Sequence, residues 1–110
     1  MRVRLVKKKT IEKYAAAHAS SKSAFKNWLT KVKTSDWHTP EDIKTTFGSA
    51  DLLGGGGNRV VFDIAGNNYR MICKYWYAAT RVHLCIKWIG THNDYDEVCK
   101  AKKQYTISDY

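Results

Sequence analysis

Proline, cysteine and acidic residues are all scarce in this 110-residue sequence, and each shortage excludes a class of protein. A single proline and a hydrophobic fraction of 44% are typical of a folded chain and argue against a disordered one. Three cysteines without paired spacing (Cys73, Cys85 and Cys99) argue against a disulfide framework and favour a reducing compartment. No apolar run approaches the roughly 18 residues of a membrane-spanning helix, and the N-terminal residues lack the apolar core of a signal peptide. We therefore expect a cytoplasmic protein without a membrane segment.

The shortage of acidic residues is concentrated in one part of the chain. Residues 1–33 hold ten lysines or arginines and one acid, whereas residues 34–110 hold nine of each sign. A basic surface of this kind attracts a polyanion, and nucleic acid is the commonest one in a cytoplasm. The alternative is a lysine-rich helical surface that serves only solubility. We favour nucleic acid as the partner, and expect Lys7, Lys8 and Lys9 to contact RNA.

Three β-rich runs between Asn58 and Tyr95 predict an antiparallel meander. The first two runs are separated by Gly66-Asn67-Asn68, residue types that suit a tight hairpin. Alternation predicts one apolar face and one face that carries four cations. The apolar face is expected to hold Val60, Phe62, Ile64, Tyr69, Met71, Cys73, Tyr75, Tyr77, Val82, Leu84, Ile86 and Trp88. The four cations of the other face are Arg59, Arg70, Lys74 and Lys87.

The rest of the chain supplies helices around this sheet. Residues 2–6 alternate as a short strand, and two stretches with helical spacing follow, the second with Phe25, Trp28, Leu29 and Val32 on one stripe. A short helix is expected from Pro40 to Phe47, and another from Asp96 to Lys103. Residues 51–57, with four glycines, are expected to form a mobile loop, and residues 106–110 a loose end.

These elements predict one α+β domain over residues 1–110. An N-terminal strand and a helical hairpin would pack on a mainly antiparallel sheet of three to four strands, followed by a short C-terminal helix. The length suffices to bury a core, and no internal repeat is present.

The residues that carry chemistry lie on the second and third runs and on the polar stretch that follows the third. Arg70 and Lys74 lie four apart on one strand, and fixed cations can stabilise charge on a phosphate. Histidine is the side chain whose ordinary ionisation falls near neutral pH, so His92 is a candidate proton-transfer group, with Tyr95 three residues further on. Taken alone, a single histidine is more often structural than catalytic.

The sequence also resembles a known family in these same residues. Asn67-Asn68-Tyr69-Arg70, Lys74, Trp88-Ile-Gly-Thr-His92 and Tyr95-Asp96 are similar to the signature of HigB-type toxins, which belong to the RelE-like superfamily. The resemblance spans the second half of the chain. It implies a RelE-like fold and the activity of a ribosome-dependent mRNA endonuclease.

The resemblance also implies functional residues and partners. The implied catalytic residues are His92, Arg70, Tyr95 and Lys74, and the implied RNA-binding residue is Asn68. The cationic sheet face adds Arg59 and Lys87 as RNA-binding candidates, and the basic N-terminal part of the chain adds Lys7, Lys8 and Lys9. Which of His92 and Tyr95 acts as acid or base stays open. The implied partners are mRNA on the translating ribosome, ribosomal RNA and a HigA-like helix-turn-helix antitoxin. We expect no cofactor and no metal, because the acids form no recognisable ligand set.

Three other functions fit parts of the same pattern. A non-catalytic RNA-binding module could stack bases on Tyr75, Trp76 and Tyr77, although no aromatic RNA-binding motif is present. A toxin of the same fold could act on another target, as the ParE-like branch does on gyrase. A purely structural partner-binding domain would leave the polar residues after the third strand without a role.

Overall fold

A computed structural model describes residues 1–110 as a five-stranded sheet with helices on both faces. In space the strands run β1-β5-β4-β3-β2, with β1 parallel to β5 and every other pair antiparallel. The elements are β1 (Arg2–Val6), α1 (Lys8–Ala17), α2 (Lys22–Lys33), α3 (Glu41–Thr46), β2 (Asp51–Leu53), β3 (Arg59–Ile64), β4 (Tyr69–Tyr77), β5 (Arg81–Thr91) and α4 (His92–Lys100). This arrangement confirms the predicted α+β fold and adds one strand to it.

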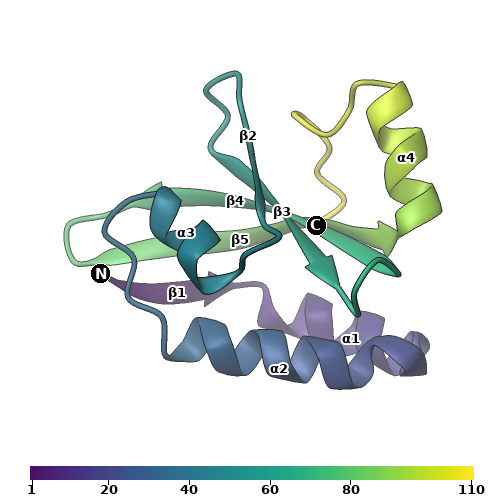
Figure 1. The fold of residues 1–110 in the computed structure, drawn as a ribbon, viewed down its shortest axis with the longest axis horizontal. Coiled ribbons are helices and arrows are strands. Elements are labelled where there is room, and N and C mark those ends of the chain that lie inside the picture. The colour runs from purple at the N-terminus through teal and green to yellow at the C-terminus, as the bar shows by residue number, and fades with distance from the viewer.

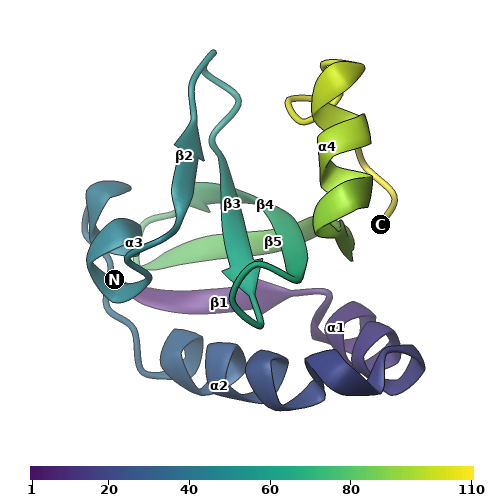
Figure 2. The ribbon, with the colours of Figure 1, turned by 45° about the vertical axis from the view of Figure 1, so that its right-hand side comes forward.

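The two N-terminal helices cover one face of the sheet. In Figures 1 and 2, α1 and α2 lie together below the strands, and α4 stands on the opposite side. The main core lies between these two helices and the sheet, because the strands point alternate apolar side chains toward the helices. Trp28, at the centre of the predicted helical stripe, packs edge-to-face on Phe62 of β3. The helical hairpin and, apart from Trp88, the apolar sheet face are therefore as the sequence predicts.

The prediction for Trp88 is wrong because β5 contains a β-bulge. Ile72 pairs with Trp88, but the next residue, Cys73, pairs with Ile86, so Lys87 is the extra residue. A bulge of one residue reverses the faces beyond it. Ile89 therefore joins the main core, and Trp88 packs on the other face in a small cluster with Val61 and Ile72.

That other face is covered in part by α4 and the segment after it. Ile107 packs against the small cluster, and the Asp109 N–H donates to the Lys87 carbonyl at 2.9 Å. Residues 106–110 are therefore held on the sheet, which corrects the prediction of a loose end. Helix α4 also begins four residues earlier than predicted, at His92, because Thr91 and Asp94 form a reciprocal capping box.

The glycine-containing segment is only partly a loop. Asp51–Leu53 form β2 against β3, and the loop over residues 54–58 joins the two strands. The sequence does not predict this strand, because it has only three residues and is followed directly by four glycines. Gly55 and Gly56 have φ values of 84° and 77°, a conformation that favours glycine.

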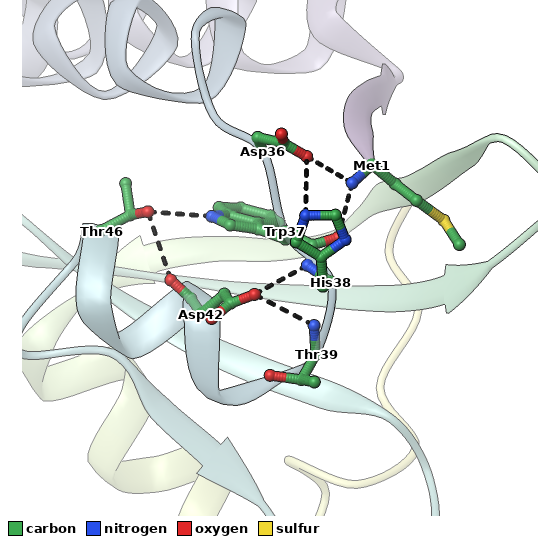
Figure 3. A network of polar contacts seen from close by, with 7 residues as sticks. All are labelled: Met1, Asp36, Trp37, His38, Thr39, Asp42 and Thr46. Atoms are coloured by element: carbon green, nitrogen blue, oxygen red, sulfur yellow. Dashed lines mark hydrogen bonds and ion pairs between the residues drawn. The ribbon is translucent and has the colours of Figure 1, made fainter.

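A polar network fixes the connection between α2 and α3 beside the start of β1 (Figure 3). The Met1 amine contacts Asp36 and donates to the Trp37 carbonyl at 3.2 Å. The Asp42 carboxylate accepts the His38 and Thr39 N–H groups at 2.7 and 3.1 Å, which ties the two residues before Pro40 to the first turn of α3. This connector thus serves the fold, away from the candidate site. None of the helices is both long enough and apolar enough to cross a membrane.

Candidate active site

Arg70, the second residue of β4, is held in place by three partners. Its Nε atom lies 3.1 Å from Oδ1 of Asp63, its register partner on β3. Its Nη1 donates to the Tyr69 carbonyl at 3.1 Å, and its Nη2 donates to the side-chain oxygen of Asn67 in the hairpin turn. The side chain is only 10% exposed. An arginine has five N–H donors, so these bonds orient the guanidinium and leave further donors for an anion.

His92 begins α4 at the same end of the sheet. Its backbone N–H donates to the Asn68 carbonyl at 3.0 Å, which ties the helix start to the hairpin turn. Its Nε2 lies 3.5 Å from Oδ2 of Asp96, one helical turn further on, and its Nδ1 is buried without a hydrogen-bond partner. The imidazole is 39% exposed, so one side of it is accessible to a substrate. Since Gly90 pairs with Arg70, His92 follows two residues after the register partner of Arg70.

Tyr95 lies between α4 and the sheet. Its ring centroid is 6.1 Å from that of Trp88, and it packs on the small cluster of Val61, Ile72 and Trp88. Burial raises its pKa well above the ordinary value, with a further contribution from the neighbouring Cys99 thiol, while the charge of Arg70 acts in the opposite direction. The raised pKa favours the protonated hydroxyl, which can donate a hydrogen bond.

Gly90 permits the close packing beneath α4. A Cβ atom at this position would lie 2.4 Å from two atoms of the Trp88 ring and 3.3 Å from Cβ of Asp94. The tryptophan ring thus lies directly over the glycine, which lets the strand pass into the helix beside it. The predicted Trp-Ile-Gly-Thr-His segment therefore has a packing role through Trp88 and Gly90.

The structure separates Lys74 and Arg59 from this group. Lys74 is exposed on β4 and lies about 13 Å along the strand from Arg70, with the Ile72–Trp88 cluster between them. Arg59 is buried, and its Nη1 donates to the carbonyls of Gln104 and Ile107 at 3.3 and 2.7 Å. Burial lowers the pKa of Arg59. The expectation of Arg59 as a free RNA-binding cation is corrected, because it anchors the C-terminal segment.

The other RNA-binding candidates are dispersed. Lys87 is half-buried at the bulge, and Asn68 is exposed in the turn next to His92. Lys7, Lys8 and Lys9 are all exposed where β1 passes into α1. Only Asn68 among these belongs to the group formed by Arg70, His92 and Tyr95.

Two acidic residues of the site were not identified from the sequence. Asp63 could have been found from the hairpin, because the turn over residues 65–68 places it opposite Arg70. Asp96 would have followed from a helix that starts at His92, since i and i+4 share a helix face. No group of three or more histidine, cysteine or acidic side chains lies close enough together to hold a metal ion.

Comparison with known proteins identifies the family. The family model described as HigB_toxin, the RelE-like toxic component of a toxin-antitoxin system, matches residues 21–98. The chain is also 26% identical over 100 residues to the mRNA interferase HigB of Escherichia coli O6:H1 (strain CFT073), covering 91% of this chain and 95% of that protein. The matched residues include the whole Arg70–His92–Tyr95 group but not Lys7, Lys8 or Lys9. This chain belongs to the HigB family of RelE-like toxins.

Proposed function

We propose that this protein is an endoribonuclease that cleaves mRNA on the translating ribosome and so inhibits translation. The observation that carries the proposal is the position of His92, half-exposed and tied to the hairpin turn that also orients the buried Arg70. A proton-transfer group beside a fixed cation is what cleavage of a phosphodiester needs. The relative named mRNA interferase HigB supports RNA as the substrate.

The proposed reaction uses a nucleophile that RNA itself supplies. The 2′-oxygen attacks the adjacent phosphorus, a new 2′-O–P bond forms, and the P–5′-O bond breaks. The proton on the 2′-hydroxyl must be removed, and the departing 5′-oxygen must receive a proton. The products are a 2′,3′-cyclic phosphate and a 5′-hydroxyl.

Each residue of the site has a distinct part in this reaction. Arg70 uses its remaining N–H donors to stabilise the negative charge of the phosphorane, and its position is set before substrate arrives. His92 transfers a proton, because its imidazole is accessible from one side. Tyr95 donates a hydrogen bond to a phosphate oxygen, because its raised pKa keeps the phenol protonated. Lys74 and Lys87 contribute positive charge along the path of the RNA.

Two partners follow from this function. The family is defined as the toxic component of a toxin-antitoxin system, which implies an antitoxin that neutralises this protein. We infer a HigA-like helix-turn-helix protein for that role. Ribosomal RNA is the second partner, and the exposed Lys7, Lys8 and Lys9 are available to contact it. Both partners place the protein in the cytoplasm.

The chemistry can be tested by the ends of the cleaved RNA. Purified protein is mixed with ribosomes stalled on a defined mRNA, and the 3′ ends of the upstream fragments are analysed. We expect a 2′,3′-cyclic phosphate or the 3′-phosphate formed from it. A 3′-hydroxyl would show that water was the nucleophile and would contradict this mechanism. Intact mRNA in the presence of folded wild-type protein would contradict the proposed substrate.

A further inference from the structure

The protein exposes an unusual tryptophan on a central strand of its sheet. Trp76 is 42% exposed, although β4 lies between β3 and β5. Its ring stacks on the imidazole of His83, its register partner on β5, with centroids 5.1 Å apart and an interplanar angle of 26°. Neither residue takes part in the site formed by Arg70, His92 and Tyr95. His83 is half-buried, so the exposed Trp76 ring, backed by this imidazole, is the part available to a planar ligand.

Cations surround this aromatic pair on the same face of the sheet. His83 pairs with Arg4 on β1 as well as with Trp76 on β4, so the three residues form a row across neighbouring strands. Alternation places Lys74 two residues before Trp76, and Arg81 two residues before His83, on this face. Arg4, Lys74 and Arg81 are all exposed and form no ion pair or side-chain hydrogen bond.

The three strands that build this surface contain no acidic residue at all. They hold six lysines or arginines: Arg2, Arg4, Arg70, Lys74, Arg81 and Lys87. Asp63 neutralises Arg70, and Arg2 donates to the Lys33 carbonyl, but no acid pairs with the three cations around Trp76. The surface therefore combines an exposed aromatic ring with positive charges that no acidic residue of these strands balances.

We propose that Trp76 and His83 stack on a base of single-stranded RNA, while Arg4, Lys74 and Arg81 contact its phosphates. Single-stranded RNA is bound in this way because unstacked bases lie on aromatic rings while cations follow the backbone. The inference rests on the proposed function for its ligand class. Trp76 lies six residues along β4 from Arg70, about 20 Å away, so the platform holds a part of the strand distant from the scissile phosphate.

The test measures binding separately from cleavage. The probe is a fluorescent single-stranded oligonucleotide with 2′-O-methyl groups on every ribose, which cannot undergo attack by a 2′-hydroxyl. Anisotropy titrations at several salt concentrations compare the wild type with Trp76→Ala and Trp76→Phe. We expect Trp76→Ala to weaken binding about 5- to 150-fold, the range of one lost base stack. Trp76→Phe should restore most of the affinity, because a phenyl ring can still stack.

Two further variants separate stacking from charge. Tyr105→Ala removes another exposed aromatic residue, 47% exposed and outside this surface, and should bind like the wild type. Arg81→Ala should lower the slope of log Kd against log salt by about one, whereas Trp76→Ala should leave that slope unchanged. Thermal unfolding of each variant establishes that it is folded.

The outcomes distinguish this inference from the proposed function. Wild-type affinity in Trp76→Ala, or failure of Trp76→Phe to restore binding in a folded protein, would overturn the stacking platform. A protein that binds the probe through Trp76 but cleaves no mRNA would overturn the proposed function alone.

Discussion

The Nε atom of Arg70 lies 3.1 Å from Oδ1 of Asp63, so the cation proposed to stabilise the phosphorane already has an anionic partner in the free protein. The pair is mostly buried on the arginine side and partly exposed on the aspartate side. Asp63 therefore orients Arg70 and also competes with the substrate for it. An incoming phosphate must share the guanidinium with this carboxylate or displace it.

Removal of the Asp63 charge should strengthen the interaction of Arg70 with RNA. Asp63→Asn keeps a hydrogen-bond acceptor but leaves one more uncompensated cation at the site. We expect tighter binding of the uncleavable oligonucleotide and a salt slope steeper by about one. Glu12→Gln removes the same charge from an exposed position on α1 and is the control for net charge alone. Equal effects of the two substitutions would argue against a specific role for the Arg70–Asp63 pair.

The contact between Gly90 and Trp88 should make Gly90→Ala destabilising. A methyl group would lie 2.4 Å from the tryptophan ring, and overpacking of this kind costs about 1–3 kcal/mol. Gly48→Ala is the matched control, because nothing lies within 4 Å of a Cβ there and its φ is not in the left-handed region. Urea unfolding provides the measurement. A free energy of unfolding equal for Gly90→Ala and the wild type would contradict the packing described beneath α4.

The buried hydroxyl of Tyr77 should make the protein sensitive to alkali. This hydroxyl has no hydrogen-bond partner, and burial, with smaller contributions from Asp42, Tyr75 and Glu41, raises its pKa to about 12. Between pH 10 and 12 the unfolded state loses this proton first, so the free energy of unfolding falls as pH rises. Tyr77→Phe should reduce that fall and leave stability at pH 7 equal or higher, because no hydrogen bond is lost. An unchanged alkaline slope in chemical unfolding would contradict this assignment.

The exposed lysines between β1 and α1 should govern docking on the ribosome more than chemistry. Replacement of Lys7, Lys8 and Lys9 by glutamine should weaken ribosome association and reduce its salt slope by about two to three. The matched variant replaces Lys100, Lys102 and Lys103, three exposed lysines in and after α4. Sedimentation with ribosomes at several salt concentrations gives the slopes. The same slope in the first variant and the wild type would remove the docking role from these lysines.

Most of the fold could be predicted because its signals are local. The alternation in β3 and β4 gives the correct faces for Phe62 and Met71, and the stripe that contains Trp28 gives α2. The face of Trp88 could not be predicted in this way. The bulge at Lys87 adds one residue to β5, and the alternation of residue types up to Ile86 gives no sign of it. The docking of the C-terminal segment on Arg59 depends on contacts 45 and 48 residues apart, which periodicity does not encode.

The sequence predicts which residues form the candidate site better than it predicts the partners that those residues contact. Arg70, His92 and Tyr95 were found from residue type and resemblance, and the structure places them at one end of the sheet. The partners of these residues depend on register and on where α4 begins, so the contacts of Asp63 with Arg70 and of Asp96 with His92 emerged only from the structure. Lys74 shares a face with Arg70, as alternation predicts, but the same alternation cannot reveal the Ile72–Trp88 cluster between them.

The most direct test of the account is the rate at which His92→Gln cleaves mRNA on programmed ribosomes in a single turnover. Glutamine keeps a similar size but cannot transfer a proton at neutral pH, and the start of α4 is held by the His92 backbone N–H and the Thr91–Asp94 box. The variant should therefore fold and bind ribosomes normally. His38→Gln, at a histidine in the α2–α3 connector, is the control and should cleave like the wild type. We predict a loss of about 100-fold or more for His92→Gln; cleavage by this variant at the wild-type rate would contradict the proposed active site.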